Sequence, residues 1–170
     1  MEFVLKKFDN GDISEAVKLV NTAYRNKKTA NAWTTEAGIV DGKRVDEDML
    51  KYIVNDPDSV VYAAYIGDKI VGSIQTKLQG ENVYIGLFAV DQQFQSHGIG
   101  KGLLEYAQME SLKIWSFKSF VMSVVSGREE LIDFYLRRGY EKTDAYLDFP
   151  ESDLWNPCSD LKLVVLKKEI

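Results

Sequence analysis

Residues 59–90 constrain the fold most, because three apolar runs follow one another with only short turns between them. The first two runs, in SVVYAAYIGDKIVGSIQTKL, are rich in β-branched and aromatic residues and flank Gly67-Asp68. A Gly-Asp pair between two such runs predicts a β-hairpin. Residues 79–82 form a second turn, and NVYIGLFAV supplies a third strand ending at Val90. The chain therefore contains an antiparallel meander.

Two helices are expected before this meander. Ser14 is a candidate N-cap for a helix over Glu15–Arg25, and a second helix is expected over Val45–Val54. Residues 26–42 between them show no period. An irregular segment of that length in a compact domain is often functional.

The rest of the chain alternates helices and strands. A helix is expected from Ile99 through IGKGLLEYAQMESLKIW, a strand over 120–125, a helix within 128–140 and a strand over 161–168. EFVLKKF at residues 2–8 suits an edge strand. The predicted order is β-α-α-β-β-β-α-β-α-β-β, one mixed α/β domain over residues 1–170 in which the meander leads into a βαβ unit.

Composition excludes several classes of protein. The net charge of −5 argues against wholesale nucleic-acid binding, and an acidic balance is compatible with a cationic amine as substrate. The single cysteine, Cys158, permits no intramolecular disulfide, and no Cys/His cluster suits a metal. No apolar run reaches the roughly 18 residues of a membrane span, and the N-terminus lacks a signal-peptide core. A cytoplasmic protein with no membrane partner is expected.

The glycine-rich stretch QSHGIGKG, residues 95–102, has the chemistry of an anion site. Such a turn exposes backbone N–H groups, and the helix that follows adds a positive dipole. It is not a P-loop, which needs GxxxxGK[ST]. It also fails the dinucleotide pattern GxGxxG, because Leu103 stands at the third glycine and SFKSFVMSV carries no acid for a ribose.

Two segments resemble motifs of the GNAT superfamily of acyl-CoA-dependent N-acetyltransferases. Residues 95–100, QSHGIG, follow LFAV and are similar to motif A, Q/R-x-x-G-x-G/A after the fourth strand. REELIDFYLRRGY, residues 128–140, resembles motif B at the expected distance with one strand between. The resemblance implies the GNAT fold, a mostly antiparallel sheet of about six or seven strands flanked by about four helices. Arg128 departs from the asparagine of many members and, with the WTTE segment from Trp33, resembles an uncharacterised branch.

The resemblance implies acetyl-CoA as cosubstrate, with no metal. Backbone amides from Gln95 through Lys101 are expected around the CoA pyrophosphate, and the main chain of Phe88–Val90 along the pantetheine arm. A plain glycine turn and an ordinary solvated Lys101 are the structural alternatives. The expected cofactor-binding residues are Phe88, Ala89, Val90, Gln95, Ser96, His97, Gly98, Ile99, Gly100, Lys101 and Arg128.

Family likeness also implies catalytic roles. Tyr135 of motif B is expected near the CoA sulfur as general acid, although a tyrosine packed in the core is the alternative. A bulge in the fourth strand would aim a backbone N–H from Leu87, Phe88 or Ala89 at the thioester oxygen. Where some members carry a glutamate base, this chain has Tyr84. His97, the sole histidine, lies beside CoA in this scheme, away from the amine.

The acceptor site is expected over the segment between the first two helices. Trp33 and Glu36 are the predicted substrate residues, with Tyr146 and Trp155 as further wall residues. The predicted function is acetyl transfer to a primary amine of a small molecule or peptide by direct attack in a ternary complex, in a monomer or homodimer. A non-catalytic acyl-CoA-binding module and a Rossmann-type nucleotide-binding protein are the alternatives. An acyl-enzyme on Cys158 lacks a visible basic partner.

Overall fold

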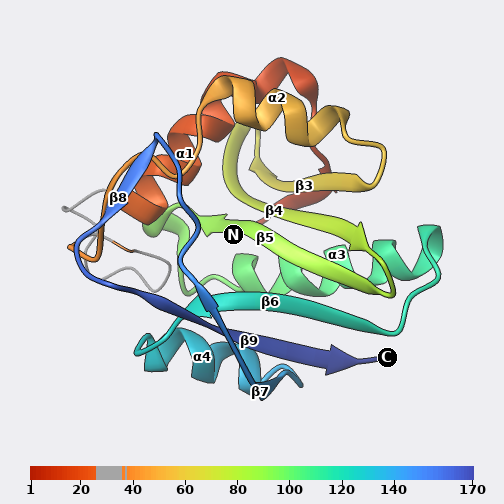
Figure 1. The fold of residues 1–170 in the computed structure, drawn as a ribbon. Helices are drawn as coiled ribbons and strands as arrows, with labels where there is room; N and C mark the ends of the chain where they lie inside the picture. The colour runs from red at the N-terminus through yellow and green to blue at the C-terminus, as the bar shows by residue number, and fades with distance from the viewer. Residues whose placement is uncertain (26–35, 37) are drawn as a thin grey trace.

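A seven-stranded sheet runs through the middle of the molecule in the computed structural model, which describes residues 1–25, 36 and 38–170 (Figure 1). The strand order is β1-β3-β4-β5-β6-β9-β7, and only β5 and β6 pair in parallel. The predicted mostly antiparallel sheet is confirmed. Its strands are β1 (Val4–Lys7), β3 (Ser59–Ile66), β4 (Lys69–Gln79), β5 (Asn82–Val90), β6 (Ser119–Val125), β9 (Lys162–Glu169) and β7 (Glu141–Asp148).

Helices cover both faces of this sheet. The helices α1 (Ile13–Arg25) and α2 (Glu47–Asn55) lie together at the top of Figure 1 and share one core with the sheet. The helices α3 (Ile99–Ile114) and α4 (Glu129–Leu136) belong to a second core on the other face. No helix in the described ranges is long and apolar enough to cross a membrane.

The two cores follow from the two-residue period of the strands. In β3, Val61, Ala63 and Tyr65 face α1 and α2, whereas Tyr62 and Ala64 face α3. Side chains of successive residues point to opposite faces of a sheet, so an unbroken apolar run fills both cores. The continuous apolar sequence of β3–β5 is explained by this burial on both sides.

The start of the first helix differs from the prediction. Helix α1 begins at Ile13, directly after a 3₁₀ turn over Asn10–Asp12. Asp9 caps this turn, because its carboxylate accepts a hydrogen bond from the Gly11 N–H at 2.9 Å. The predicted Ser14 cap is therefore wrong. Ser14 lies inside the helix and donates its hydroxyl to Glu47 Oε1 at 2.5 Å.

Two short strands were missed. β2 (Val40–Gly42) and β8 (Trp155–Pro157) form a separate antiparallel pair, so the segment expected to be irregular ends in a strand. β2 and β8 lie far apart in the sequence, and each is only three residues long, which is too short to show a strand period. The second helix also begins two residues later than expected, at Glu47, because the Asp46 side chain caps it by accepting from the Met49 N–H. Helix α4, over Glu129–Leu136, is shorter than the motif B segment 128–140 in which a helix was predicted.

Candidate active site

A cavity of about 390 Å³ lies where β5 and β6 separate. The two strands pair only from Asn82 to Tyr84, opposite Ser119 to Val121, and then diverge toward the left of Figure 1. β4 still pairs with β5 as far as Val90. The other edge of residues 85–90 therefore faces the opening between the strands. The described lining residues are Tyr24, Arg25, Glu36, Arg44, Met49, Ile53, Gln75, Tyr84, Ile85, Gly86, Leu87, Phe88, Met122, Ser123, Val124, Val125, Arg128, Leu131, Tyr135, Phe149, Pro150, Trp155 and Leu163.

A β-bulge bends β5 at the wall of this cavity. Ser73 pairs with Ala89 and Gln75 with Gly86, so β5 carries one residue more than β4 there. Leu87 has a φ of +45°, an uncommon value for a residue with a side chain. The extra residue shifts the facing of the strand, because Val83, Ile85, Phe88 and Val90 lie in one core and Leu87 and Ala89 in the other.

Side-chain hydroxyl groups hold the bulged backbone. Ser73 donates its hydroxyl to the Leu87 carbonyl at 2.8 Å, and Tyr24 donates to the Phe88 carbonyl at 2.9 Å. Burial raises the pKa of Tyr24 to about 12, so its hydroxyl stays protonated and keeps donating at neutral pH. Tyr24 thus links the end of α1 to the β5 wall.

Tyr135 enters the cavity from α4 and is almost fully buried. Its ring lies 6.2 Å from Phe88 and 5.8 Å from Tyr140, centroid to centroid. Burial, with smaller effects of Tyr24, Tyr140 and Tyr84, raises the pKa of Tyr135 well above that of a free tyrosine. Its hydroxyl is therefore neutral at physiological pH and is a hydrogen-bond donor.

Tyr84 lines the same cavity from β5, and its ring lies against Gly86. A Cβ atom at Gly86 would lie 2.8 Å from Cε1 of that ring and 3.2 Å from the Gln75 side-chain oxygen. Glycine at this position therefore permits the observed position of the Tyr84 ring.

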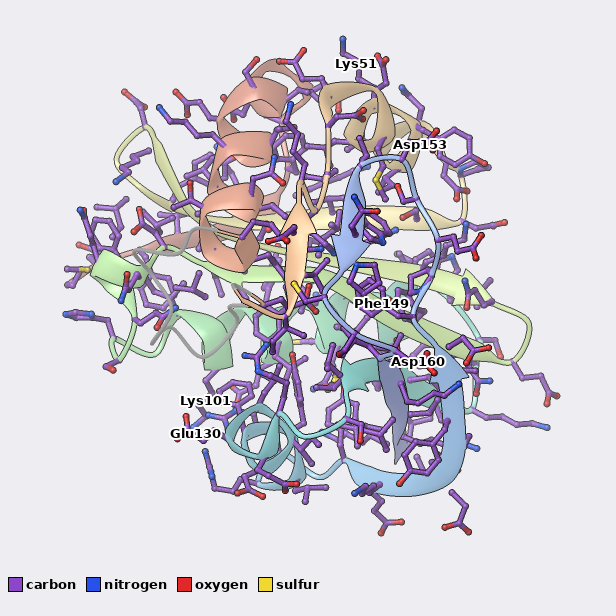
Figure 2. The ribbon with its side chains drawn as sticks, turned by 60° about the vertical axis from the view of Figure 1, so that its left-hand side comes forward. Lys51, Lys101, Glu130, Phe149, Asp153 and Asp160 are labelled. Atoms are coloured by element: carbon purple, nitrogen blue, oxygen red, sulfur yellow. The ribbon has the colours of Figure 1, made fainter. Side chains whose placement is uncertain are left out.

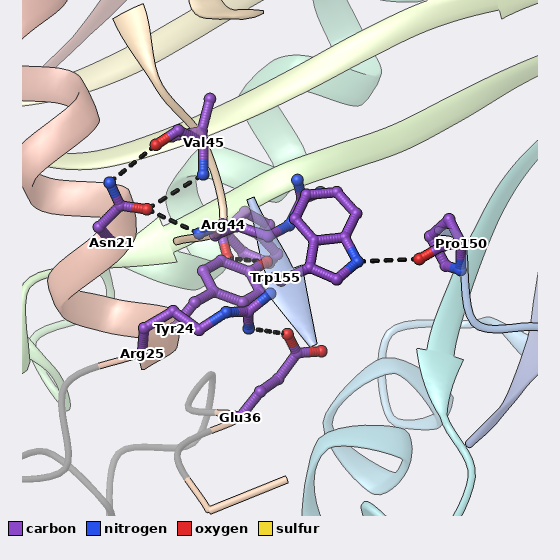
Figure 3. A network of polar contacts seen from close by, with 9 residues as sticks. Asn21, Tyr24, Arg25, Glu36, Arg44, Val45, Pro150 and Trp155 are labelled. Atoms are coloured by element: carbon purple, nitrogen blue, oxygen red, sulfur yellow. Dashed lines mark hydrogen bonds and ion pairs between the residues drawn. The ribbon is translucent and has the colours of Figure 1, made fainter. Parts of the chain in front are cut away.

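Three arginines and a glutamate line the cavity, and Figure 3 shows two of these arginines, Arg25 and Arg44, with Glu36. Arg25, the last residue of α1, forms a buried ion pair with Glu36, and their side chains are 6% and 12% exposed. The Glu36 N–H donates to the Tyr24 carbonyl at 2.8 Å, which holds Glu36 against the helix end. Nε and Nη2 of Arg25 are buried and have no hydrogen-bond partner among the residues that the structure describes.

Arg44 lies between two aromatic rings. Its guanidinium is 5.6 Å from the Tyr24 ring centroid and 5.8 Å from that of Trp155. The backbone is fixed there because Asn21 Oδ1 accepts from the N–H groups of Arg44 and Val45 at 2.8 and 3.0 Å. Trp155 is held in turn by donating its indole N–H to the carbonyl of Pro150 (Figure 3).

Arg128 stands at the N-cap of α4 and lines the cavity beside this group. Burial lowers the pKa of Arg128, while Glu36 and Tyr24 act in the opposite direction. An arginine nevertheless stays charged in proteins. The side chain that replaces the family's asparagine therefore places a positive charge in the cavity.

The glycine turn lies outside the lining of the cavity. Gly98, the N-cap residue of α3, has a φ of +81°, and Ser96 also has a positive φ of +67°. The His97 Nδ1–H is within reach of the Phe94 and Gln95 carbonyls, at 3.2 and 2.9 Å, so this histidine stabilises the turn. Lys101 is exposed and lies 3.9 Å from Glu105, one turn further along α3.

Residues 20–149 match the family model of the acetyltransferase (GNAT) domain. This chain belongs to the GNAT acetyltransferase family. It is thereby an acyltransferase of the N-acetyltransferase type, and the predicted GNAT fold is confirmed. No curated protein sequence matches the chain.

Solved GNAT structures resemble the chain over its whole length. The PaiA N-acetyltransferase from Thermoplasma acidophilum, in complex with coenzyme A, has a TM-score of 0.73 at 13% identity and covers 100% of both chains. Ribosomal-protein-S18-alanine N-acetyltransferase from Escherichia coli has a TM-score of 0.73 at 13% identity, covering 99% of this chain and 94% of its own. An N-acetyltransferase from Staphylococcus aureus Mu50 reaches 0.75 at 14%, covering 99% and 98%. At these identities the likeness shows the fold.

The GNAT cavity brings together many of the residues predicted from sequence. Glu36, Leu87, Phe88, Tyr84, Arg128, Tyr135 and Trp155 line it. Ala89 and Val90 lie on the same strand with their side chains in the cores. Tyr146 is 55% exposed on β7 and is absent from the described lining, so its role as a wall residue stays a prediction. Trp33 lies outside the described residues.

Sequence reasoning missed Tyr24, Arg25 and Arg44. Tyr24 and Arg25 are the last two residues of the predicted helix α1. They follow its last buried residue, Ala23, so the sequence alone gives them the pattern of an ordinary solvent-exposed helix end. Arg44 stands in a segment without period. A tyrosine-arginine pair at the end of a helix that precedes a long unpatterned segment was the available signal. Cys158 is exposed and is absent from the described lining.

Proposed function

We propose that this GNAT protein is an acetyl-CoA-dependent N-acetyltransferase that acetylates a primary amine by direct attack, with both substrates bound together. One observation carries the proposal: β5 and β6 part beside a bulge in β5, and the buried, protonated Tyr135 lies in the resulting cavity. In this proposal residues 1–170 act as one catalytic domain. The coenzyme A complex of a protein with the same fold supports it.

The residues present fit coenzyme A in two places. Gly98 adopts the left-handed backbone conformation at the N-cap of the 16-residue helix α3. A Cβ atom at Gly98 would meet nothing within 4 Å, so the space over its backbone is open. That arrangement suits a pyrophosphate at the helix N-terminus. Gln95 through Lys101 would hold it through their backbone amides. The edge of β5 at Phe88–Val90 that faces the opening would pair with the pantetheine arm, and Arg128 would lie beside its path.

Acetyl-CoA supplies an acetyl group activated as a thioester. A C–N bond forms between the amine nitrogen and the acetyl carbon, and the C–S bond breaks. The amine loses a proton, and the sulfur gains one. The products are the N-acetyl amide and free coenzyme A. The chain must therefore stabilise charge on the carbonyl oxygen and supply a hydrogen-bond donor to the sulfur.

Residues of the cavity are assigned to these tasks. The bulged backbone of Leu87–Ala89 would donate an N–H to the carbonyl oxygen. Its carbonyl groups are already engaged by Ser73 and Tyr24, which fixes the strand before substrate arrives. Tyr135 would donate to the leaving sulfur. Its raised pKa makes full proton transfer uphill, so we assign it a hydrogen bond that strengthens as the C–S bond breaks.

Proton removal from the amine is assigned to the polar side of the cavity. Tyr84 lies close enough to Tyr24 and Tyr135 to contribute to the raised pKa of each. It would orient the amine, or a water that takes the proton of the amine. Glu36 would form part of the acceptor wall. We do not assign it as the base, because its ion pair with Arg25 reduces its availability to take a proton. An amine acceptor is in keeping with the activity named for the Escherichia coli enzyme, which acts on an alanine of ribosomal protein S18.

Thermal unfolding with acetyl-CoA, coenzyme A or NAD tests the cofactor. A ligand at about 100 times its Kd adds roughly 2.7 kcal/mol to stability, so Tm should rise with both CoA species and not with NAD. The variant Tyr135→Phe then tests catalysis. We expect kcat to fall about 100-fold, within the range for loss of an acid–base group, while the Kd for acetyl-CoA changes less than about twofold.

Tyr146→Phe is the matched control, since this exposed tyrosine lies on β7 outside the described lining. Its kcat should equal that of the parent. Binding of acetyl-CoA without turnover on any amine would instead support a non-catalytic acyl-CoA-binding module. No Tm shift with either CoA species would remove both functions.

A further inference from the structure

The charge of the cavity is opposite to that of the chain. The protein as a whole carries −5, yet the charged residues among its described lining are Arg25, Arg44 and Arg128 against Glu36. Arg25, Arg44 and Glu36 lie together near Tyr24, at the polar end of the cavity (Figure 3). This polar end is the acceptor side of the function proposed above, on which the inference rests.

Burial makes this positive charge significant. A buried cation is destabilised unless an anion or several acceptors compensate it. Glu36 pairs with Arg25 through Nη1, and the buried Nε and Nη2 of the same guanidinium have no hydrogen-bond partner in the described ranges. Residues 26–35 and 37 contain no Asp or Glu and include Lys27 and Lys28, so that stretch brings no carboxylate to the site.

Arg44 has the geometry to recognise an anion. The rings of Tyr24 and Trp155 hold its guanidinium, and no ion pair joins it to a carboxylate in the part of the chain that the structure describes. A guanidinium presents a planar fork of N–H donors that matches the two oxygens of a carboxylate or phosphate. Packing between rings restricts its rotation, so less entropy is lost when it binds.

We propose that the acceptor is a small amine that also carries an anionic group, a carboxylate or a phosphate, and that Arg44 and the buried Nε and Nη2 of Arg25 bind this group. The site would hold the anion at the polar end while the amine points toward Tyr84 and the β5 bulge. Amino-acid-sized molecules suit a cavity of about 390 Å³ that also receives the thioester. Cationic amines such as polyamines, with which the acidic composition is compatible, are disfavoured because the local charge is positive.

Paired amines provide the test. Each amino acid is compared with its own carboxamide, and O-phosphoethanolamine with ethanolamine, while 1,3-diaminopropane represents cationic amines. Initial rates are measured by mass spectrometry of the acetylated product, because the exposed Cys158 thiol interferes with thiol reagents. We expect kcat/KM to be about 10- to 100-fold higher for the anionic member of a pair, the range for one charged hydrogen-bonded contact.

This comparison is conservative. A carboxylate raises the pKa of a neighbouring amine, so the amino acid contains less of the neutral, reactive form than its carboxamide does. A preference for the acid therefore cannot come from amine reactivity. The carboxylate and phosphate arms show which anion the site takes.

The variant Arg44→Gln links the preference to the site. Its KM for the preferred anionic amine should rise about 10- to 100-fold, while its KM for neutral amines and its Tm shift with acetyl-CoA stay near those of the parent. Arg137→Gln is the control, since this exposed arginine at the end of α4 is absent from the described lining. If Arg44→Gln is poorly folded, Arg44→Lys keeps the charge, loses the fork and should show the intermediate loss.

The outcomes separate the inference from the function. Equal or better kcat/KM for the carboxamides, ethanolamine or 1,3-diaminopropane would overturn the anionic acceptor and leave the acetyltransferase standing. So would turnover restricted to amines without an anion. Failure of acetyl-CoA to raise Tm would instead overturn the proposed function itself. An unchanged preference in Arg44→Gln would remove Arg44 from the site.

Discussion

Leu87 shows how one residue sets the geometry of the cavity wall. A residue with a Cβ at φ of +45° is strained by about 1–2 kcal/mol relative to glycine. Its side chain is nevertheless 2% exposed in the core beneath α1, and Ser73 holds its carbonyl. Burial of the leucine thus offsets the strain. The bulge costs stability locally and is retained where β5 borders the cavity.

We expect this strain to reverse the usual order of alanine and glycine. At an ordinary strand position, glycine is less stable than alanine by about 0.5–1 kcal/mol. At position 87, Leu87→Gly should be at least as stable as Leu87→Ala, because glycine relieves the positive φ. Urea unfolding of the pair measures this. The same pair at Ile85, which lies before the bulge, should keep the ordinary order, and an ordinary order at both positions would contradict the strain.

The element that organises the site is β5. Its first three residues pair with β6, its bulge turns the chain, and its later residues border the opening. Gly86 lies between these regions and accommodates the Tyr84 ring. The position of the Tyr84 ring, to which we assign a role in orienting the amine, therefore depends on the absence of a side chain at residue 86.

Gly86→Ala tests this dependence. The added methyl group would contact the Tyr84 ring, so we expect a loss of about 1–3 kcal/mol in unfolding free energy, typical of overpacking, together with a lower kcat. In a Tyr84→Ala background the same change should cost less than about 0.5 kcal/mol, because the clashing ring is gone. Equal costs in the two backgrounds, measured as a double-mutant cycle, would show that the ring is not the obstacle.

Local patterns predicted the elements that depend on local signals. The hairpin around Gly67-Asp68, the end of β5 at Val90 and the start of α3 at Ile99 agree with the prediction. Pairings between distant segments gave no such signal. β2 meets β8 only in the folded chain, and this pair brings Trp155 beside Arg44.

The charged end of the site was unpredictable for the same reason. Arg25, Glu36 and Arg44 converge from three places in the sequence, and no spacing rule connects them. Family likeness pointed to the glycine turn and Tyr135, because they belong to motifs A and B, and to Tyr84 through its place on the fourth strand. Phe149, by contrast, belongs to no motif, so no sequence pattern indicated a place for it in the cavity. It lines the cavity from the segment after β7 and lies near the middle of the molecule in Figure 2, whereas Lys51 lies at the rim.

Across the whole molecule, tyrosines link the two cores to stability at high pH. Tyr62 and Tyr135 belong to the core beneath α3 and α4, and Tyr65 to the core beneath α1. Burial raises the pKa of Tyr62 and Tyr65 to about 12, as it does that of Tyr24, and raises that of Tyr135 well above its ordinary value. In the unfolded chain each tyrosine ionises near 10.

The sign of the pH dependence follows from these directions. Below pH 10 both states keep the phenolic protons, and the stabilisation is fully present. Above pH 10 the unfolded chain loses protons that the folded chain retains, so the free energy of unfolding falls as pH rises toward 12. Each tyrosine ionised only in the unfolded state lowers it by about 1.4 kcal/mol per pH unit. Tyr24 and Tyr135, both deeply buried, together give a fall of roughly 2–3 kcal/mol per unit.

Urea unfolding at pH 9, 10 and 11 measures this fall. Tyr62→Phe removes one ionisation from both states, so its free energy of unfolding should decline less steeply above pH 10 than that of the parent. Tyr52→Phe is the matched control, because Tyr52 is 73% exposed on α2 and lies in neither core. A parent protein equally stable at pH 9 and 11, or equal slopes in the two variants, would show that the buried phenols ionise as freely folded as unfolded. That result would also undermine the assignment of Tyr135 as a donor held protonated by burial, because both conclusions rest on the same desolvation.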